Sequence, residues 1–198
     1  MISGSALNTA FTLLIQPCGF VEFTILKRLV EVLSEKFVSE IDVSTENLTP
    51  PLTYYNWLRE QYHAGKVLDW IYEKIRYLGY DRVLAVCGFD AYVEPLNFVF
   101  GLADPFKGIA AVFLPRLRPE FYGFKPNVDR YFERLVKECM HELGHTFGLE
   151  HCRNRKCVMS FSNSVIDVDH KLAAFCLSCS SKLKGVGIQL GSSAILSQ

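Results

Sequence analysis

The sequence lacks an excess of charge of either sign. Its 198 residues include 21 Lys and Arg against 21 Asp and Glu, and no basic stretch is interleaved with aromatic residues. Proteins that bind nucleic acid need a basic face to neutralise its phosphates. We therefore expect no nucleic-acid partner.

Long hydrophobic runs are also missing. The apolar stretch Phe11–Ile15 is far shorter than the roughly 20 residues of a membrane-spanning helix, and Met1–Ala10 before it contains no Lys or Arg. A signal peptide needs a basic start and a longer apolar core. We therefore expect no membrane contact and a cytoplasmic location. We also expect a monomer, although no sequence feature fixes the oligomeric state.

Cysteine is scarce over most of the chain and concentrated near its end. Three of the seven cysteines, Cys18, Cys87 and Cys139, are scattered, and we interpret them as core residues. The other four lie between residues 152 and 179. In a reducing compartment, clustered cysteines bind metal more often than they form disulfides.

Length and composition predict one domain with an α/β fold. With 49% hydrophobic residues, the 198-residue chain can form one well-packed core, but it is too short for two full-sized domains and a linker. A strand, a helix and a second strand open the chain, which is typical of a right-handed parallel crossover. We predict strands at 11–16, 41–44, 82–87, 97–100 and 108–114, helices at 21–37, 66–77 and from 127 or 129 onward, and a loosely ordered tail at 184–198.

The most informative motif is the run His141 to His145, which reads HELGH. Two histidines four residues apart on a helix project from one face about one turn apart, so both can bind one ion. Gly148 can take the left-handed conformation that ends a helix, which lets His151 return as a third ligand. Three imidazoles leave one position of a tetrahedral zinc ion open, which is typical of a catalytic site.

This spacing predicts peptide hydrolysis. A zinc ion lowers the pKa of its water from 15.7 to about 7, and Glu142 is placed to take the proton as the general base and pass it to the leaving amine. Coincidental core histidines are a poor alternative, because these five fixed positions match by chance in on the order of one chain in a hundred thousand. A metal site without activity is the stronger alternative.

The run His141 to His151 resembles the extended zinc signature of metzincins. Met159, eight residues after His151, resembles the methionine of the tight turn beneath the metal in those proteins, although a lone methionine is more often core packing. Some metzincins carry a tyrosine two residues after this methionine, where its hydroxyl assists the transition state. Here that position is Phe161, so the ion acts alone or with another donor.

The four clustered cysteines predict a second zinc site. They form two closely spaced pairs, Cys152 with Cys157 and Cys176 with Cys179, and four thiolates are the usual ligands of a closed structural site. Such a site would attach the C-terminal segment, which is too short for a core of its own, to the segment that carries His151. Two disulfides or uncoordinated thiols are the alternative.

The motif region as a whole resembles the archaemetzincin family. The resemblance is carried by the run His141 to His151 with Cys152, Cys157, Met159, Cys176 and Cys179, and more loosely by Tyr62, Asp90 and 97–103. It implies a compact α/β (α+β) metzincin-like fold with a mixed twisted sheet, an active-site helix and two zinc ions, one catalytic and one structural. It also implies aminopeptidase-like cleavage of short peptides.

We therefore expect a single catalytic domain over residues 1–198, made of an N-terminal α/β subdomain (1–147) and a zinc-attached C-terminal subdomain (148–198). The expected activity is zinc-dependent peptide hydrolysis, with a peptide substrate paired along an edge strand. The rival is a catalytically inert, zinc-stabilised module that binds peptide or protein, for which Arg153, Arg155 and Lys156 offer a basic surface. Three charges on a short loop are more often only a solvated face.

Overall fold

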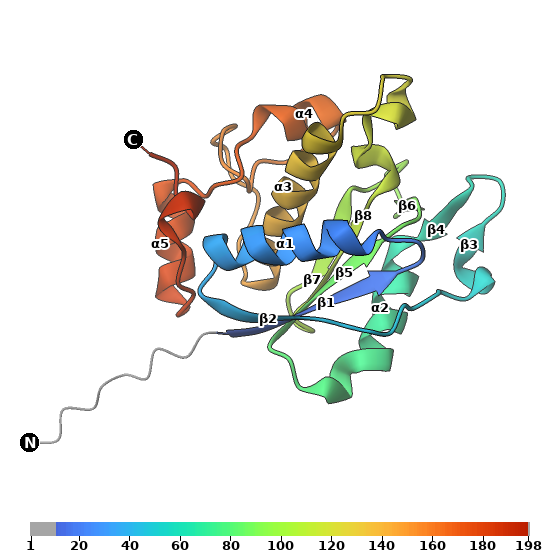
Figure 1. The fold of residues 1–198 in the computed structure, drawn as a ribbon, viewed down its shortest axis with the longest axis horizontal. Helices are drawn as coiled ribbons and strands as arrows, with labels where there is room; N and C mark the ends of the chain where they lie inside the picture. The colour runs from blue at the N-terminus through green and yellow to red at the C-terminus, as the bar shows by residue number, and fades with distance from the viewer. Residues whose placement is uncertain (1–10, 198) are drawn as a thin grey trace, which may run out of the picture.

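A five-stranded mixed sheet forms the centre of the molecule in the computed structural model, which describes residues 11–197 (Figure 1). The strand order is β2-β1-β5-β8-β7. The first four are mutually parallel: β2 (Ser39–Val43), β1 (Phe11–Cys18), β5 (Arg82–Cys87) and β8 (Ile109–Phe113). The fifth strand, β7 (Gly101–Asp104), pairs antiparallel with β8 and leaves one of its own edges unpaired. The sheet is therefore mixed, as the family resemblance implies.

Helices cover both faces of this sheet. The alternating side chains of the strands divide into two apolar clusters, one beneath α1 (Phe23–Lys36) and α3 (Val128–Thr146) and the other beneath α2 (Ala64–Ile75). The apolar stripe of α3 that the sequence predicts, which includes Leu135, Cys139 and Leu143, is fully buried. Each helix thus forms because its apolar side finds a sheet face to cover.

The remaining elements are short. They comprise β3 (Tyr55–Asn56), β4 (Gln61–His63), β6 (Ala91–Tyr92), α4 (Val165–His170), α5 (Leu177–Gly185), and the 3₁₀ turns η1 (Leu52–Tyr54), η2 (Arg76–Leu78), η3 (Pro115–Leu117), η4 (Pro119–Tyr122) and η5 (Ser192–Ala194). Strands β3, β4 and β6 form a small second sheet at the side of the molecule. Within residues 11–197, no helix is long and apolar enough to cross a membrane.

Three predictions about the elements need correction. The first strand does not end at Gln16 but continues through Pro17 to Cys18. Strand β2 pairs with β1 only as far as Ile15, so the missing N–H of Pro17 leaves no hydrogen bond between these two strands unmade. The short strand expected at 97–100 lies instead at Gly101–Asp104. The tail is ordered over its described part, where Gly191 donates its N–H to Lys36 O at 2.9 Å. Met1–Ala10 and Gln198, also covered by sequence predictions, lie outside the described residues.

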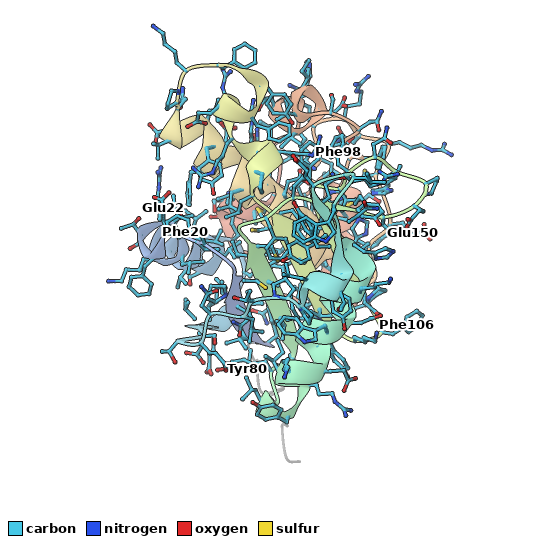
Figure 2. The ribbon with its side chains drawn as sticks, turned by 90° about the vertical axis from the view of Figure 1, so that its right-hand side faces the viewer. Phe20, Glu22, Tyr80, Phe98, Phe106 and Glu150 are labelled. Atoms are coloured by element: carbon cyan, nitrogen blue, oxygen red, sulfur yellow. The ribbon has the colours of Figure 1, made fainter. Side chains whose placement is uncertain are left out.

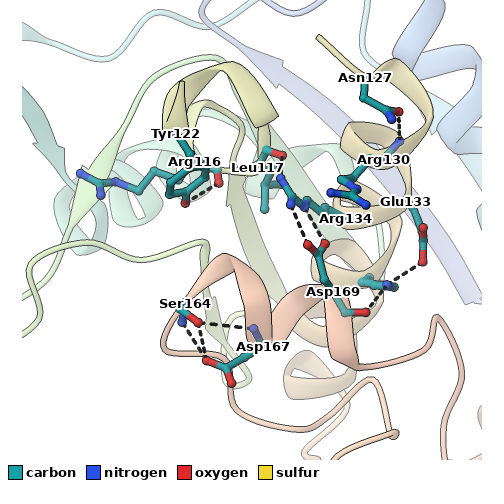
Figure 3. A network of polar contacts seen from close by, with 11 residues as sticks. Arg116, Leu117, Tyr122, Asn127, Arg130, Glu133, Arg134, Ser164, Asp167 and Asp169 are labelled. Atoms are coloured by element: carbon teal, nitrogen blue, oxygen red, sulfur yellow. Dashed lines mark hydrogen bonds and ion pairs between the residues drawn. The ribbon is translucent and has the colours of Figure 1, made fainter. Parts of the chain in front are cut away.

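Polar contacts hold helix α3 at its start and farther along its first half, and several of them are drawn in Figure 3. The side chain of Asn127 caps the helix by accepting from Arg130 N at 2.9 Å, so the start is at Asn127 and not at Asp129. Farther along, the buried guanidinium of Arg134 makes two 2.7 Å hydrogen bonds to the carboxylate of Asp169 in α4. These contacts set the position of the helix that carries the HELGH motif.

Candidate metal centre and active site

The structure brings the three predicted histidines together. Helix α3 presents His141 and His145, and the chain turns back after the helix through Gly148, whose φ is +85°. His151 then faces the helix, and one ring nitrogen of each histidine lies within 4.8 Å of the other two. The left-handed turn thus follows from a residue without a Cβ at this position.

Backbone carbonyls orient two of the three imidazole rings. Nδ1 of His141 lies 2.8 Å from Val158 O, and Nδ1 of His145 lies 2.7 Å from Leu149 O. Because a carbonyl only accepts hydrogen bonds, each Nδ1 carries the proton and each Nε2 keeps its lone pair. The two Nε2 atoms face one another at 3.1 Å. Two facing lone pairs repel unless a cation lies beside them, so the donor set fits a zinc ion.

The histidines are held in the neutral form that binds metal. Burial, followed by the charge of Lys171, lowers the pKa of His141 well below its usual value. Burial also lowers the pKa of His145 and of the more exposed His151. A neutral imidazole keeps the lone pair that a metal ion needs.

Glu142 lies beside the histidine cluster, against the edge strand. Its carboxylate is buried, and a Cβ added at Gly101 would lie 2.5 Å from both Cγ and Oε1 of Glu142. Burial raises the pKa of Glu142 well above its usual value; the nearby charge of Glu138 raises it further and that of Lys171 lowers it. The strand β7 and the helix α3 thus hold this carboxylate between them.

A buried ion pair lies behind the cluster. Lys171 Nζ lies 2.8 Å from Glu138 Oε1, and the two groups form an ion pair without the angles of a hydrogen bond. The same Nζ lies 3.5 Å from both Ser160 O and His141 Nδ1. Lys171 and Glu138 were not predicted as site residues, and no spacing rule singles them out. Gly101 was also missed as a site residue, although it falls inside the run 97–103 that carries part of the resemblance.

Met159 packs directly beneath the histidine-bearing turn of α3. The side chain is fully buried, and a Cβ added at Gly144 would collide with its Sδ atom. Phe161 lies farther out, with its ring 5.0 Å from that of His151. The glycine of the HELGH run therefore has a packing role as well as a place in the motif, because it makes room for the methionine.

The four predicted cysteines form a second cluster next to the first. Their Sγ atoms lie within 4.8 Å of one another, and Cys152 Sγ is 3.7 Å from Cys176 Sγ. A tetrahedron with Zn–S bonds of about 2.3 Å has S···S edges of about 3.8 Å, so the spacing fits zinc. All seven cysteines are free thiols, which does not support the disulfide alternative. The scattered Cys18, Cys87 and Cys139 are buried core residues as predicted.

A cleft of about 680 Å³ opens over the histidines. It is lined by residues 93–105 other than Glu94 and Asp104, by the histidine-bearing face of α3, by 148–151 and by 161–163. Figure 2 labels Phe98 and Glu150, which belong to two of these lining segments. The aromatic segment 54–62 does not contribute to the lining; Trp57 and Leu58 are exposed and Tyr62 is buried.

The fold and the site together define a zinc metallopeptidase. A scan against family models matches "Peptidase family M54" over residues 13–185. An archaemetzincin from Saccharolobus solfataricus is 41% identical over 177 residues, which cover 89% of this chain and 94% of that protein. The chain belongs to this family, the archaemetzincins of peptidase family M54. Family membership favours an enzyme over a binding module.

Solved structures agree with this assignment. The crystal structure of archaemetzincin from Methanopyrus kandleri has a TM-score of 0.76 and 37% sequence identity, and the match covers 91% of this chain and 97% of that one. A zinc-dependent peptidase from Methanocorpusculum labreanum has a TM-score of 0.72 and 30% identity, with 87% of this chain and 99% of that one covered. The predicted metzincin-like α/β fold is thereby confirmed.

Proposed function

We propose that His141, His145 and His151 hold the catalytic zinc ion and that Glu142 is the general base for hydrolysis of short peptides. The observation that carries the proposal is the convergence of three neutral imidazoles and one buried carboxylate at the floor of a single cleft. Met159 beneath the histidines and the left-handed turn at Gly148 support the assignment to the metzincin class.

The chemistry divides between the ion and the chain. Zinc, when bound, polarises the scissile carbonyl and acidifies water. Glu142 accepts a proton from the attacking water at its carboxylate and delivers it to the leaving amine nitrogen. The unpaired edge of β7 (Gly101–Asp104) offers backbone N–H and C=O groups to an extended peptide. Phe161 supplies no hydroxyl, so oxyanion stabilisation falls to the ion or to another donor.

The size of the cleft supports short substrates. Its volume of about 680 Å³ falls within the range of about 300–1,000 Å³ that is typical of sites for small ligands. We therefore propose aminopeptidase-like cleavage near a peptide end.

We further propose two zinc ions per chain, the second a structural ion held by Cys152, Cys157, Cys176 and Cys179. Residues 1–198 would act as one catalytic domain with parts at 1–147 and 148–198, because the main apolar cluster takes residues from both parts. None of the seven cysteines forms a disulfide, which suits a reducing compartment and supports a cytoplasmic location. We retain the monomer as the proposed state, to be tested by light scattering.

The decisive experiment replaces the general base. Glu142→Gln keeps the shape of the side chain and is not a ligand, so the variant should retain about two zinc ions per chain while peptide hydrolysis falls by at least about 100-fold. Elemental analysis and a mixture of short peptides measure the two quantities on the same preparation. Hydrolysis at the parental rate would show that Glu142 is not the base, and zinc loss would show that it is a ligand.

A further inference from the structure

The charged side chains that line the cleft are all acidic. Among the described residues, the lining contains Glu138, Glu142 and Glu150 but no Lys or Arg. Glu138 is paired with Lys171, and Glu142 lies buried beside β7. Glu150 is left as the cleft carboxylate that faces solvent.

The backbone on both sides of Glu150 is held in place. Leu149 O accepts from His145 Nδ1 at 2.7 Å, and Cys152 N donates to Met159 O at 2.8 Å. The carboxylate itself makes no hydrogen bond or ion pair with any residue between 11 and 197. Glu150, labelled in Figure 2, is thus an unpaired carboxylate on a fixed backbone, and it is available to a ligand in the cleft that it lines.

We propose that Glu150 binds the N-terminal ammonium group of the substrate and thereby selects peptides with a free amino end. The inference rests on the proposed peptidase function and adds a specificity-determining residue to it. A carboxylate and an ammonium form charge-assisted hydrogen bonds, which are stronger than neutral ones. The carboxyl end of a peptide would meet glutamates and no cationic side chain in this cleft, which disfavours carboxypeptidase action.

The position of Glu150 agrees with cleavage of the first peptide bond. Glu150 and the three histidines line the same cleft, so an ammonium bound by Glu150 lies in the cleft that contains the histidine cluster. The α-ammonium of the first residue must lie close to the scissile carbonyl when that residue is removed. A lysine side chain within a peptide also carries an ammonium group that Glu150 could bind. The experiment therefore includes a lysine-containing peptide as a separate substrate.

The kinetic arm compares zinc-loaded parent, Glu150→Gln and Glu150→Asp. The substrates are a peptide with a free amino end, its N-acetylated form and an N-acetylated form with one lysine. For Glu150→Gln, kcat/KM on the free-amine peptide should fall about tenfold, which is the size of effect expected when a hydrogen bond to a charged group is lost in a partly open site. Glu150→Asp keeps the carboxylate and should retain part of the parental rate. Activity on the acetylated peptide should not change.

The binding arm needs no turnover. In the Glu142→Gln background, the dissociation constants of Ala-Ala-Ala-amide and its N-acetylated form are measured with and without Glu150→Gln. The free-amine form should bind more tightly than the acetylated form. Adding Glu150→Gln should raise the dissociation constant of the free-amine form about tenfold and leave that of the acetylated form unchanged. Glu31→Gln, an exposed glutamate on α1 far from the cleft lining, is the matched control and should change neither constant.

The outcomes separate this proposal from the proposed function. A parent that hydrolyses none of the peptides overturns the peptidase proposal, while the binding arm still decides the role of Glu150. Equal binding of free and acetylated peptides, or an unchanged preference after Glu150→Gln, overturns the role of Glu150. A loss confined to the lysine-containing peptide overturns the assignment to the N-terminal ammonium.

Discussion

Gly101 packs tightly against the carboxylate of Glu142. A hydrogen at the Cα of Gly101 leaves room for the carboxylate, whereas a methyl group would lie 2.5 Å from its Oε1. Glycine is therefore required here for close approach and not for an unusual backbone conformation. The position of the proposed base depends on a residue 41 positions earlier in the chain.

Gly101→Ala should accordingly inactivate the enzyme while leaving its metal content intact. The new methyl group displaces Glu142 from the histidine face, and we expect hydrolysis to fall by at least about 100-fold, the order of magnitude for losing a positioned base. Gly185→Ala is the matched control, because open space surrounds that glycine. Steady-state rates and zinc content decide the matter; a Gly101→Ala enzyme with parental activity would mean that Glu142 works from another position.

At the scale of elements, the pair Arg134–Asp169 joins α3 to α4. Partial burial raises the pKa of Asp169, but the hydrogen bonds and charge of Arg134 lower it more, so the net pKa lies below the usual range. A lowered pKa in the folded state stabilises the fold above the unfolded value near pH 4, and this stabilisation is lost as the pH falls through the lowered pKa.

Asp169→Asn should therefore destabilise the protein at neutral pH and flatten its acid unfolding below about pH 4. Removing the partner of a buried guanidinium costs 3–5 kcal/mol in fully buried pairs, and we expect about 1–2 kcal/mol because the Asp169 side chain is 35% exposed. Urea unfolding at pH 7 and pH 3 measures both effects. Asp129→Asn, which removes an exposed pair with Arg28, should change little. Equal stability of Asp169→Asn and the parent at both pH values would contradict this account.

The two metal clusters should fail differently when a ligand is lost. Binding energy at a closed thiolate site contributes directly to folding, so Cys176→Ser should lower the melting temperature by about 5 °C or more. His145→Ala should lose the catalytic ion with a smaller fall. Because His151 and Cys152 are consecutive, Cys176→Ser should also reduce activity by loosening the third histidine. Melting curves with zinc content for both variants test this; a Cys176→Ser protein that keeps two ions and the parental melting temperature would exclude a structural zinc site.

Local patterns in the sequence predicted most elements and the histidine and cysteine clusters, but they did not predict the residues that surround these clusters. Periodicity gave β5 at its observed bounds, and fixed spacings gave the histidine and cysteine clusters. The strand expected at 97–100 was misplaced because Phe98 and Phe100 carry the apolar signal while the paired residues are Gly101–Asp104. Lys171 and Glu138 escaped notice because a buried ion pair has no sequence period.

At the scale of the whole molecule, the C-terminal tail ties distant parts of the chain together. Gly191 bonds to the end of α1, and Phe175 and Ala194 are joined by a 2.7 Å backbone hydrogen bond. Composition alone predicted a loosely ordered tail, because Gly and Ser are common in mobile segments. The prediction failed because several of the stabilising contacts come from residues more than 150 positions away, such as Lys36, whose Nζ donates to Ser193 O at 2.7 Å.

A chain truncated after Gly187 should therefore have a less stable fold than the full-length chain. Loss of these contacts uncovers Phe37 and Phe175, which are buried in the main apolar cluster, and we expect the melting temperature to fall by at least about 5 °C. The intact chain should unfold in one transition, as one domain does. Calorimetry of both chains measures this; two separate transitions in the intact chain would contradict the single-domain proposal.

The carbonyls of Val158 and Leu149 that orient His141 and His145 belong to the main chain. Many zinc enzymes use carboxylate side chains for this purpose, and a point mutation can remove those. Every residue type has a carbonyl, so the imidazole tautomers here are insensitive to substitution at the two positions that set them. Over evolutionary time, side chains around the site are therefore free to diverge in search of new substrates while the ability to hold a metal ion is inherited with the fold.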